Sequence, residues 1–115
     1  MKTAFGWISI SGTRYEKDVI IHADSTVSKR RKKLSKDKKA GYGHTPLSKA
    51  ELDFLADEKP KVVFVGTGQS GALPITPGAR SLLEKYDVVI GPTPDILPRL
   101  EEERRKKVAI LHITC

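Results

Sequence analysis

The feature that most constrains the fold is the segment at residues 61–66, Lys-Val-Val-Phe-Val-Gly, in which an uninterrupted apolar run follows Lys61. A strand with apolar side chains on both faces is typical of the centre of a parallel sheet that helices cover on both sides. Two further, mostly apolar runs follow at 87–91 and 108–113. We expect all three runs to be strands, with the first two buried, so this part of the chain is predicted to be of the α/β class.

Helices are predicted between these strands from capping residues and prolines. A helix over about residues 49–57 follows a capping box, in which the Ser48 side chain caps the helix and Glu51 reaches back. Thr76 and Thr93 are each followed by proline, the residue favoured at the first helical position, so each threonine is predicted to cap a further helix. Strands that alternate with helices indicate a mixed, mostly parallel sheet.

The N-terminal residues predict antiparallel structure. Residues 4–10 and 15–22 are rich in β-prone side chains, and Ser11-Gly12-Thr13 forms a turn between them. Two strands with a short connection that contains glycine favour an N-terminal β-hairpin. The chain of 115 residues lies within the commonest domain size of roughly 100–150 residues, so residues 1–115 are expected to form a single domain.

Residues 29–39, Lys-Arg-Arg-Lys-Lys-Leu-Ser-Lys-Asp-Lys-Lys, account for the net charge of the chain. They contain eight basic residues and one acidic residue, so their net charge equals the +7 of the whole sequence. A segment of this charge density repels itself and resists burial, which predicts a basic mobile arm at about 24–41. The simplest interpretation of such a segment is a solvated loop.

The same basic segment also favours an anionic partner, either a protein or a polyanion. Nucleic acid is one such polyanion, because phosphate contacts require only Lys and Arg, although the segment lacks aromatic residues for base stacking. The candidate polyanion-binding residues are Lys29, Arg30, Arg31, Lys32, Lys33, Lys36, Lys38 and Lys39.

A glycine-rich segment follows the first apolar run and matches the pattern G-x-G-x-x-G. In a dinucleotide fold the third glycine opens a helix, and an acidic residue ends the next strand. Here a helix begins only near Pro77 and the next strand ends at Gly91, which argues against a dinucleotide site. A structural turn and a small-anion site built from N–H groups are left as alternatives. The candidate ligand-binding residues are Gly66, Thr67, Gly68, Gln69, Ser70, Gly71 and Thr93.

The remaining chemistry-bearing residues give no catalytic pattern. No acid, histidine or cysteine lies in the loops after Gly66 and Gly91, which weakens an enzymatic interpretation. The three histidines and Cys115 lack metal-ligand spacing. On a strand, His112 and Cys115 would point to opposite faces. We therefore predict no catalytic residue, no metal site and no cofactor.

Cysteine usage and hydropathy suggest a location. The single cysteine allows no intramolecular disulfide, which fits a reducing compartment. The first residues do not resemble a signal peptide, and no window approaches the roughly 20 apolar residues of a membrane span. We expect a cytoplasmic protein without a membrane span.

Three sequence strings together resemble one family. They are Gly-His-Thr-Pro-Leu at 43–47, Val-Phe-Val-Gly-Thr-Gly at 63–68 and Leu-His-Ile-Thr-Cys at 111–115. With Phe5-Gly6 and Tyr15 they span nearly the whole chain, which resembles the adipogenesis-associated domain family of small α/β proteins. Mitochondrial relatives of that family act as respiratory complex I assembly factors.

The resemblance implies a three-layer α/β fold around a mixed sheet, and it carries over no catalytic residue. It marks five recurrent motif positions, which are Gly66, Gly68, His112, Thr114 and Cys115.

Two functional classes follow from the sequence. The first is a non-enzymatic binding or assembly protein that docks an anionic partner through the basic arm. The second is a small-anion or small-ligand domain, with or without enzymatic activity, that uses the glycine loop at 66–71. The first predicts affinity that falls steeply with salt, whereas the second predicts thermal stabilisation by a specific small molecule.

Overall fold

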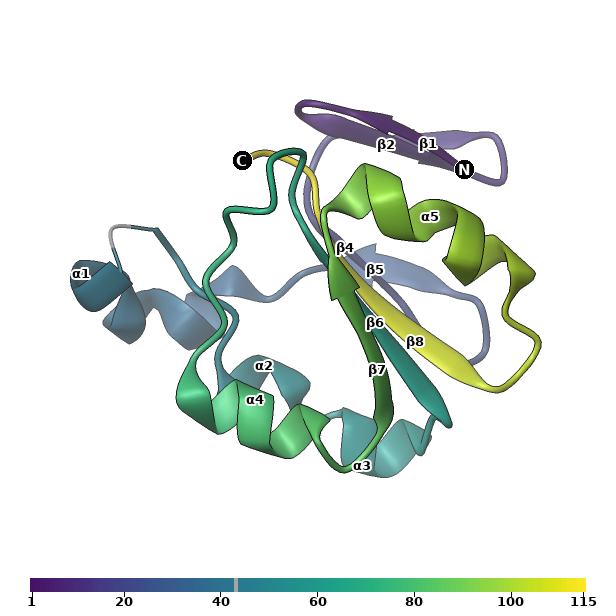
Figure 1. Ribbon diagram of the computed structural model, residues 1–115. Coiled ribbons are helices and arrows are strands. Elements are labelled where there is room, and N and C mark those ends of the chain that lie inside the picture. Colours follow the sequence, from purple (N-terminus) through teal and green to yellow (C-terminus); the bar gives the residue numbers. More distant parts are fainter. Residues whose placement is uncertain (43) are drawn as a thin grey trace.

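The computed structural model describes residues 1–42 and 44–115, with the backbone alone at residue 40. It contains two β-sheets and several short helices (Figure 1). The strands are β1 (Lys2–Ala4), β2 (Trp7–Ile10), β3 (Thr13–Tyr15), β4 (Val19–Ile21), β5 (Val27–Lys29), β6 (Val62–Thr67), β7 (Asp87–Gly91) and β8 (Lys107–His112). The helices are the 3₁₀ helix η1 (Lys32–Lys38) and α1 (Lys39–Tyr42), α2 (Lys49–Leu52), α3 (Leu55–Glu58), α4 (Pro77–Leu83) and α5 (Thr93–Glu102).

The larger sheet has the strand order β5-β4-β8-β6-β7. Strand β6 pairs in parallel with β7 and β8, whereas β4 pairs antiparallel with β8 and β5. The mixed α/β class is therefore confirmed, but the prediction of a mostly parallel sheet is wrong. The reason is β5, a strand that lies inside the segment predicted to be a loop and that a short connection joins to β4, which forces antiparallel pairing.

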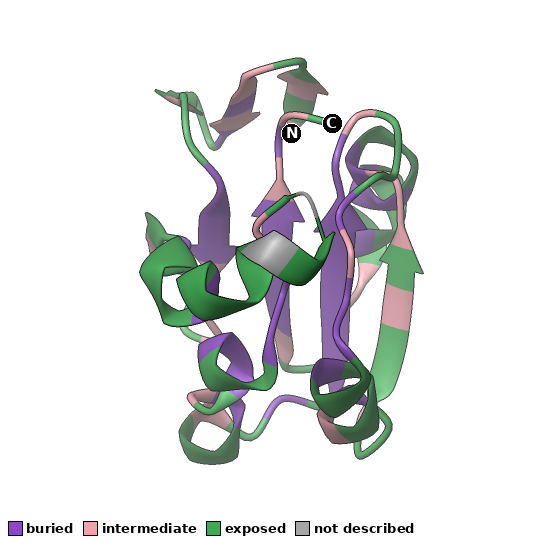
Figure 2. Cartoon of the chain, turned by 90° about the vertical axis from the view of Figure 1, so that its left-hand side faces the viewer, coloured by how far each residue is buried: buried purple, intermediate pink, exposed green. Residues whose placement is uncertain are grey.

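Strand β6 is buried on both faces, as its apolar run predicts. Val63 and Val65 belong to one cluster of buried side chains, and Val62 and Phe64 belong to the cluster on the opposite face. The prediction that 87–91 is also a buried strand is wrong. Strand β7 lies at the edge of the sheet, where Val88 and Ile90 are each 37% exposed. In Figure 2 the edge strand is coloured green and pink, the colours of exposed and intermediate residues.

Helices cover one face of the larger sheet, and a helix with the small sheet covers the other (Figure 1). The first face carries α2, α3 and α4, whose Leu52, Leu55 and Leu83 pack with the sheet. The second face is shared by α5 and the small sheet, with Leu100 and Ile8 in one cluster. Because this face is divided between two kinds of element, the three-layer arrangement stays a prediction.

The N-terminal hairpin is confirmed between β2 and β3. Its two connecting residues, Ser11 and Gly12, have φ angles of 49° and 82°, which is the backbone of the two-residue turns that match strand twist. The expected single strand at 4–10 is divided, since the chain turns between β1 and β2. The N–H of Gly6 in that turn donates to the carbonyl of Ile113 at 2.8 Å and so ties the small sheet to the end of β8.

The predicted helix at 49–57 forms as two short helices, α2 and α3, and its capping box does not form. The Ser48 side chain makes no cap hydrogen bond, and Glu51 is turned towards Arg30 instead. The cap of α4 is confirmed, because Thr76 Oγ1 accepts from the N–H of Ala79. The predicted cap of the third helix is wrong, because Pro92 holds the N-cap position of α5 and Thr93 is its first helical residue. The hydroxyl of Thr93 instead accepts from the N–H of Gly68 in the loop after β6.

Candidate anion-binding cleft

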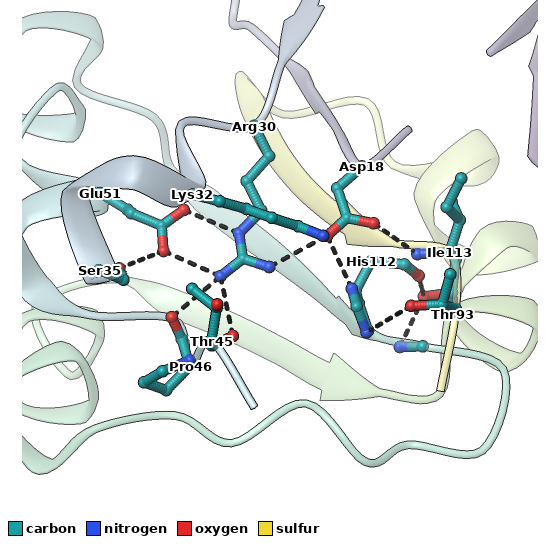
Figure 3. A network of polar contacts seen from close by, with 12 residues as sticks. Asp18, Arg30, Lys32, Ser35, Thr45, Pro46, Glu51, Thr93, His112 and Ile113 are labelled. Atoms are coloured by element: carbon teal, nitrogen blue, oxygen red, sulfur yellow. Dashed lines mark hydrogen bonds and ion pairs between the residues drawn. The ribbon is translucent and has the colours of Figure 1, made fainter. Parts of the chain in front are cut away.

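A buried carboxylate, Asp18, joins three parts of the chain (Figure 3). Its Oδ2 accepts hydrogen bonds from Arg30 Nη1 at 3.0 Å and from His112 Nδ1 at 2.7 Å, and its Oδ1 accepts from the N–H of Ile113 at 2.9 Å. The Lys32 ammonium lies 3.5 Å from Oδ2. Burial by itself raises the pKa of Asp18, but the hydrogen bonds and nearby positive charges outweigh burial and lower the pKa to about 2.

The Arg30 side chain is turned into the molecule, contrary to the expectation that the basic segment resists burial. Arg30 is only 1% exposed, and its Nε and Nη2 donate to the two carboxylate oxygens of Glu51 at 2.8 and 2.9 Å. Nη2 also donates to the carbonyl of Pro46 at 2.9 Å. Burial lowers the pKa of Arg30, but its bonds to Glu51 and Asp18 more than compensate and raise it. Arg30 is thus withdrawn from the surface on which a polyanion would dock.

A second buried contact fixes the basic segment to the helical layer. The Ser35 hydroxyl in η1 donates to Glu51, and the Ser48 hydroxyl lies 2.6 Å from Ser35 Oγ. Residues 24–41 therefore contain β5, η1 and part of α1 instead of a structureless loop, and most of η1 lies exposed in front of the sheet (Figure 2). The mobility of this segment stays a prediction.

A cleft of about 230 Å³ lies beside this network, where the parallel strands β6 and β8 end. Ligands in α/β sheets bind at such carboxyl ends of strands. We define the cleft by its lining residues, which are Lys32, Lys39, His44, Thr45, Ala72, Leu73, Pro74, His112, Thr114 and Cys115. It thus contains three of the recurrent motif positions named above.

The cleft is electropositive. Two ammonium groups, those of Lys32 and Lys39, border it, and none of its described lining residues is an Asp or a Glu. Asp18 lies behind the cleft, and its carboxylate contacts Lys32 as well as Arg30 and His112. A concave surface with one sign of charge concentrates ions of the opposite sign, so the cleft favours a small anion.

His112 is oriented by the network. The ionised Asp18 can only accept, so the Nδ1 of His112 carries the proton of their hydrogen bond. Its Nε2 then lies on the side of Thr114, whose Oγ1 is 3.2 Å away. The expectation that His112 and Cys115 point to opposite faces held for a continuous strand, but β8 ends at His112, and both residues line the cleft.

The N–H groups of the glycine loop donate to atoms of the chain itself. Those of Gly68, Gln69 and Ser70 donate to Thr93 Oγ1 and to the carbonyls of Thr114 and Cys115, at 3.1, 2.7 and 2.9 Å respectively. The next three N–H groups, at 71–73, also donate to backbone carbonyls. A ligand at these candidate residues would therefore have to be held by side chains, such as Gln69 and Ser70, and not by a nest of N–H groups.

The glycines of this loop permit close approach of neighbouring chain segments. A Cβ atom on Gly68, whose φ is +100°, would lie 2.3 Å from the carbonyl carbon of Cys115. One on Gly66 would lie 2.5 Å from the hydroxyl oxygen of Thr93. The loop thus holds residues 112–115 at the edge of the cleft, which supports the structural alternative for the glycine pattern. Ligand binding by Gly66, Thr67, Gly68, Gln69, Ser70, Gly71 and Thr93 stays a prediction.

The exposed basic side chains border a different region. A hollow of about 510 Å³ is lined by basic residues alone, which are Lys29, Arg30, Arg31, Lys32, Lys33 and Lys36. We call the exposed residues Lys29, Arg31, Lys33 and Lys36 the basic surface. Lys38 lies apart, beside the start of α4.

Sequence reasoning missed Asp18, Ser35 and the ion-pair role of Glu51. Asp18 meets His112 across 94 positions of the chain and Arg30 across 12, so no local spacing indicates these contacts. The one available signal is the position of Asp18 directly before the apolar strand β4.

Over residues 1–42 and 44–115, no group of three or more His, Cys, Asp or Glu side chains could hold a metal ion. Within the same residues, no helix has the length and apolar character needed to cross a membrane. A cytoplasmic location stays a prediction.

Comparisons with known proteins agree with the fold. The structure is similar to the crystal structure of the conserved hypothetical protein PH1505 from Pyrococcus horikoshii OT3, with a TM-score of 0.87, 30% identity, and coverage of 100% of this chain and 98% of that one. It is also similar to a structure named MT938, with a TM-score of 0.81, 31% identity, and coverage of 100% and 96%. The comparison with curated proteins gave no match.

The family comparison covers nearly the whole sequence. A family model described as "Protein of unknown function (DUF498/DUF598)" matches residues 1–112. Its description names neither adipogenesis nor complex I assembly, so that resemblance stays a prediction. The chain belongs to the DUF498/DUF598 family.

Proposed function

We propose that this protein binds a small anion, a carboxylate or a phosphate, in the cleft between the basic segment and the ends of β6 and β8. The observation that carries the proposal is the lining of the cleft, whose described residues include Lys32, Lys39, His44 and His112 and no Asp or Glu. In this proposal the anion lies beside the glycine loop and not within it.

The residues that line the cleft have different roles in binding the anion. Lys32 and Lys39 supply positive charge, and Lys32 is held at one side by its contact with Asp18. When His112 carries a second proton, its Nε2–H can donate to an anion while Asp18 still holds Nδ1.

The test is thermal unfolding in phosphate, sulfate, acetate and citrate, with the ionic strength held constant by sodium chloride. A specific anion at 100 times its dissociation constant stabilises a protein by about 2.7 kcal/mol. We expect Lys39→Ser to remove the rise in Tm. Lys36→Ser is the matched control, because it makes the same charge change outside the cleft.

Two results would contradict this function. One is a wild-type protein whose Tm does not respond to any anion of the panel. The other is an equal loss of the response in the Lys39 and Lys36 variants, which would show that the effect depends on net charge alone.

A second candidate function is docking of an anionic macromolecule on the basic surface. The hollow lined by basic residues alone favours it, and this binding mode fits the assembly role suggested by the family resemblance. Arg30 takes no part, because its guanidinium is occupied by Glu51 and Asp18.

This second function is tested by replacing Lys29, Arg31, Lys33 and Lys36 with Ser. We expect the variant to elute from heparin at lower salt, with Arg30 left in place to preserve the fold. On duplex DNA, the dependence of log K on log salt should weaken by about 0.9 for each lost phosphate contact. Unchanged heparin retention in this variant would contradict docking of an anionic macromolecule on the basic surface.

A further inference from the structure

We infer that Ser28, His22 and Glu58 form a second, nucleophilic site for acyl transfer, independent of the anion-binding cleft. His22 follows β4, Ser28 lies in β5 and Glu58 ends α3. The His22 Nε2 lies 2.7 Å from Ser28 Oγ, and the His22 Nδ1 lies 2.6 Å from Glu58 Oε2. A hydroxyl, an imidazole and a carboxylate in hydrogen-bonded sequence are the groups that activate a serine nucleophile.

The imidazole of His22 is held in the tautomer that this chemistry needs. Glu58 Oε1 accepts from the N–H of Ala23 at 2.8 Å, which fixes the carboxylate while Oε2 accepts from His22 Nδ1–H. The Nε2 lone pair then faces the Ser28 hydroxyl, which donates to it. Phe54 packs edge-on against the ring, with the ring centroids 5.6 Å apart, and so limits its rotation.

The position of Ser28 in the sheet supplies a candidate oxyanion donor. The N–H of Arg30 donates to Asp18 and the N–H of His22 donates to Thr26, so residues 26, 28 and 30 turn their backbone groups towards β4. Because backbone groups alternate along a strand, the N–H of Lys29 points to the outer side of β5. Strand β5 is the last strand at this end of the sheet, so this donor is directed to solvent beside the nucleophile.

A hollow of about 440 Å³ adjoins His22 and indicates the class of substrate. It lies by Lys106, directly before β8, whereas the anion-binding cleft lies at the other end of that strand. Asp24 and Asp57 border it along with Glu58 and Lys106. Hydrogen bonds from Thr26 lower the pKa of Asp24 and keep it ionised. The excess of carboxylates favours an ester that carries a positive charge.

The reaction we infer is hydrolysis of an ester in two steps. Ser28 Oγ attacks the ester carbonyl carbon and its proton passes to His22 Nε2, and the alcohol leaves with that proton as the C–O bond breaks. Water then attacks the acyl-serine, gives its proton to His22 and releases the carboxylic acid, and Ser28 regains its proton. Glu58 is a positioning residue, which stabilises the imidazolium formed in each step.

The experiment combines covalent labelling with ester turnover. The protein is treated with a fluorophosphonate, and the labelled residue is identified by mass spectrometry of the intact chain and its peptides. We expect one label on Ser28, no label in Ser28→Ala, and unchanged labelling in Ser81→Ala, a control on the exposed side of α4. His22→Gln should slow labelling by about 100-fold, at the low end of general-base effects.

Turnover is measured with p-nitrophenyl acetate and with the ethyl esters of lysine and glutamate. We expect p-nitrophenol release at least about tenfold above that of Ser28→Ala, and faster hydrolysis of the lysine ester than of the glutamate ester. Lys85→Ser, which removes an exposed lysine that lines neither this hollow nor the cleft, should leave both readouts unchanged.

The inference is overturned by a wild-type chain that takes no label. It is equally overturned by labelling that does not depend on His22, or by turnover equal to that of the Ser28→Ala variant. Circular dichroism and Tm of the variants confirm that each compared chain is folded.

Discussion

The guanidinium of Arg30 donates hydrogen bonds to both carboxylate oxygens of Glu51, at 2.8 and 2.9 Å. The two residues are 21 positions apart in the sequence. Both side chains are almost fully buried. A buried ion pair of this kind stabilises little relative to an apolar pair, but the loss of one partner leaves a charge without compensation. The pair therefore makes the attachment of the basic segment sensitive to single substitutions.

Arg30→Ala is expected to lower the free energy of unfolding by about 3–5 kcal/mol, because Glu51 and Asp18 then lose their buried counter-charge. Arg31→Ala, which removes an exposed arginine at the next position, should change it by no more than about 0.5 kcal/mol. Urea unfolding of both variants measures the difference. Similar midpoints for the two would show that Arg30 is not buried in solution.

Asp18 should make stability depend on acidic pH. Its pKa is lowered from 3.8 to about 2 in the folded chain, so its contribution is fully present above pH 3.8 and is lost as the pH falls through about 2. By linkage the contribution is roughly 2 kcal/mol. Urea unfolding of the wild type and of Asp18→Asn between pH 2 and about 5 measures it. Parallel pH curves for the two proteins would contradict the assignment to Asp18.

Gly68→Ala is expected to destabilise the protein more than Gly12→Ala does. Both glycines have positive φ angles, of +100° and +82°, so both substitutions introduce backbone strain of about 1–3 kcal/mol. Only at Gly68 would the added Cβ also collide with Cys115 and His112, whereas nothing lies within 4 Å at Gly12. The loss of Tm in Gly12→Ala measures the backbone strain alone, and the additional loss in Gly68→Ala measures the collision. Equal losses at the two sites would show that residues 112–115 do not pack against the loop.

Hydrogen exchange should be uneven along residues 24–41. The N–H of Arg30 donates to Asp18 at 2.9 Å beside a buried side chain, so it is expected to exchange slowly. The exposed N–H groups of residues 31–33 should exchange fast. Ser35→Ala removes the bond from η1 to Glu51 and should accelerate exchange through η1 while leaving β6 unaffected. Uniformly fast exchange over 24–41 would instead support a mobile arm.

Local patterns in the sequence predicted the elements whose environment is set by their own residues. Strand β6 was foreseen because its apolar side chains require cover on both faces, and the start of α4 because Thr76 and Pro77 act within one turn. The turn at Ser11 and Gly12 was foreseen for the same reason.

Features that depend on distant partners were not foreseen. Arg30 and Arg31 are neighbouring residues of the same type, so the sequence does not show which of them is buried. Arg30 is the buried one because it binds the carboxylates of Asp18 and Glu51. Glu51 fitted a capping box equally well, since the same carboxylate can serve a helix end or an ion pair. The candidate cleft was missed for a related reason, because its basic and imidazole side chains come from 32–44 and 112, which only the folded sheet brings together.

The position of β8 between β4 and β6 has a consequence for how the protein reaches its native state. The residues that join the two halves of the sheet are the last of its strands to be synthesised, so β4 and β6 have no shared neighbour until residues 107–112 have emerged from the ribosome. Loop closure over such separations is slow, and the contact of Asp18 with His112 spans 94 positions. Until β8 is synthesised, one edge of β4 and one edge of β6 therefore remain unpaired. Unpaired strand edges are prone to pair wrongly with other chains.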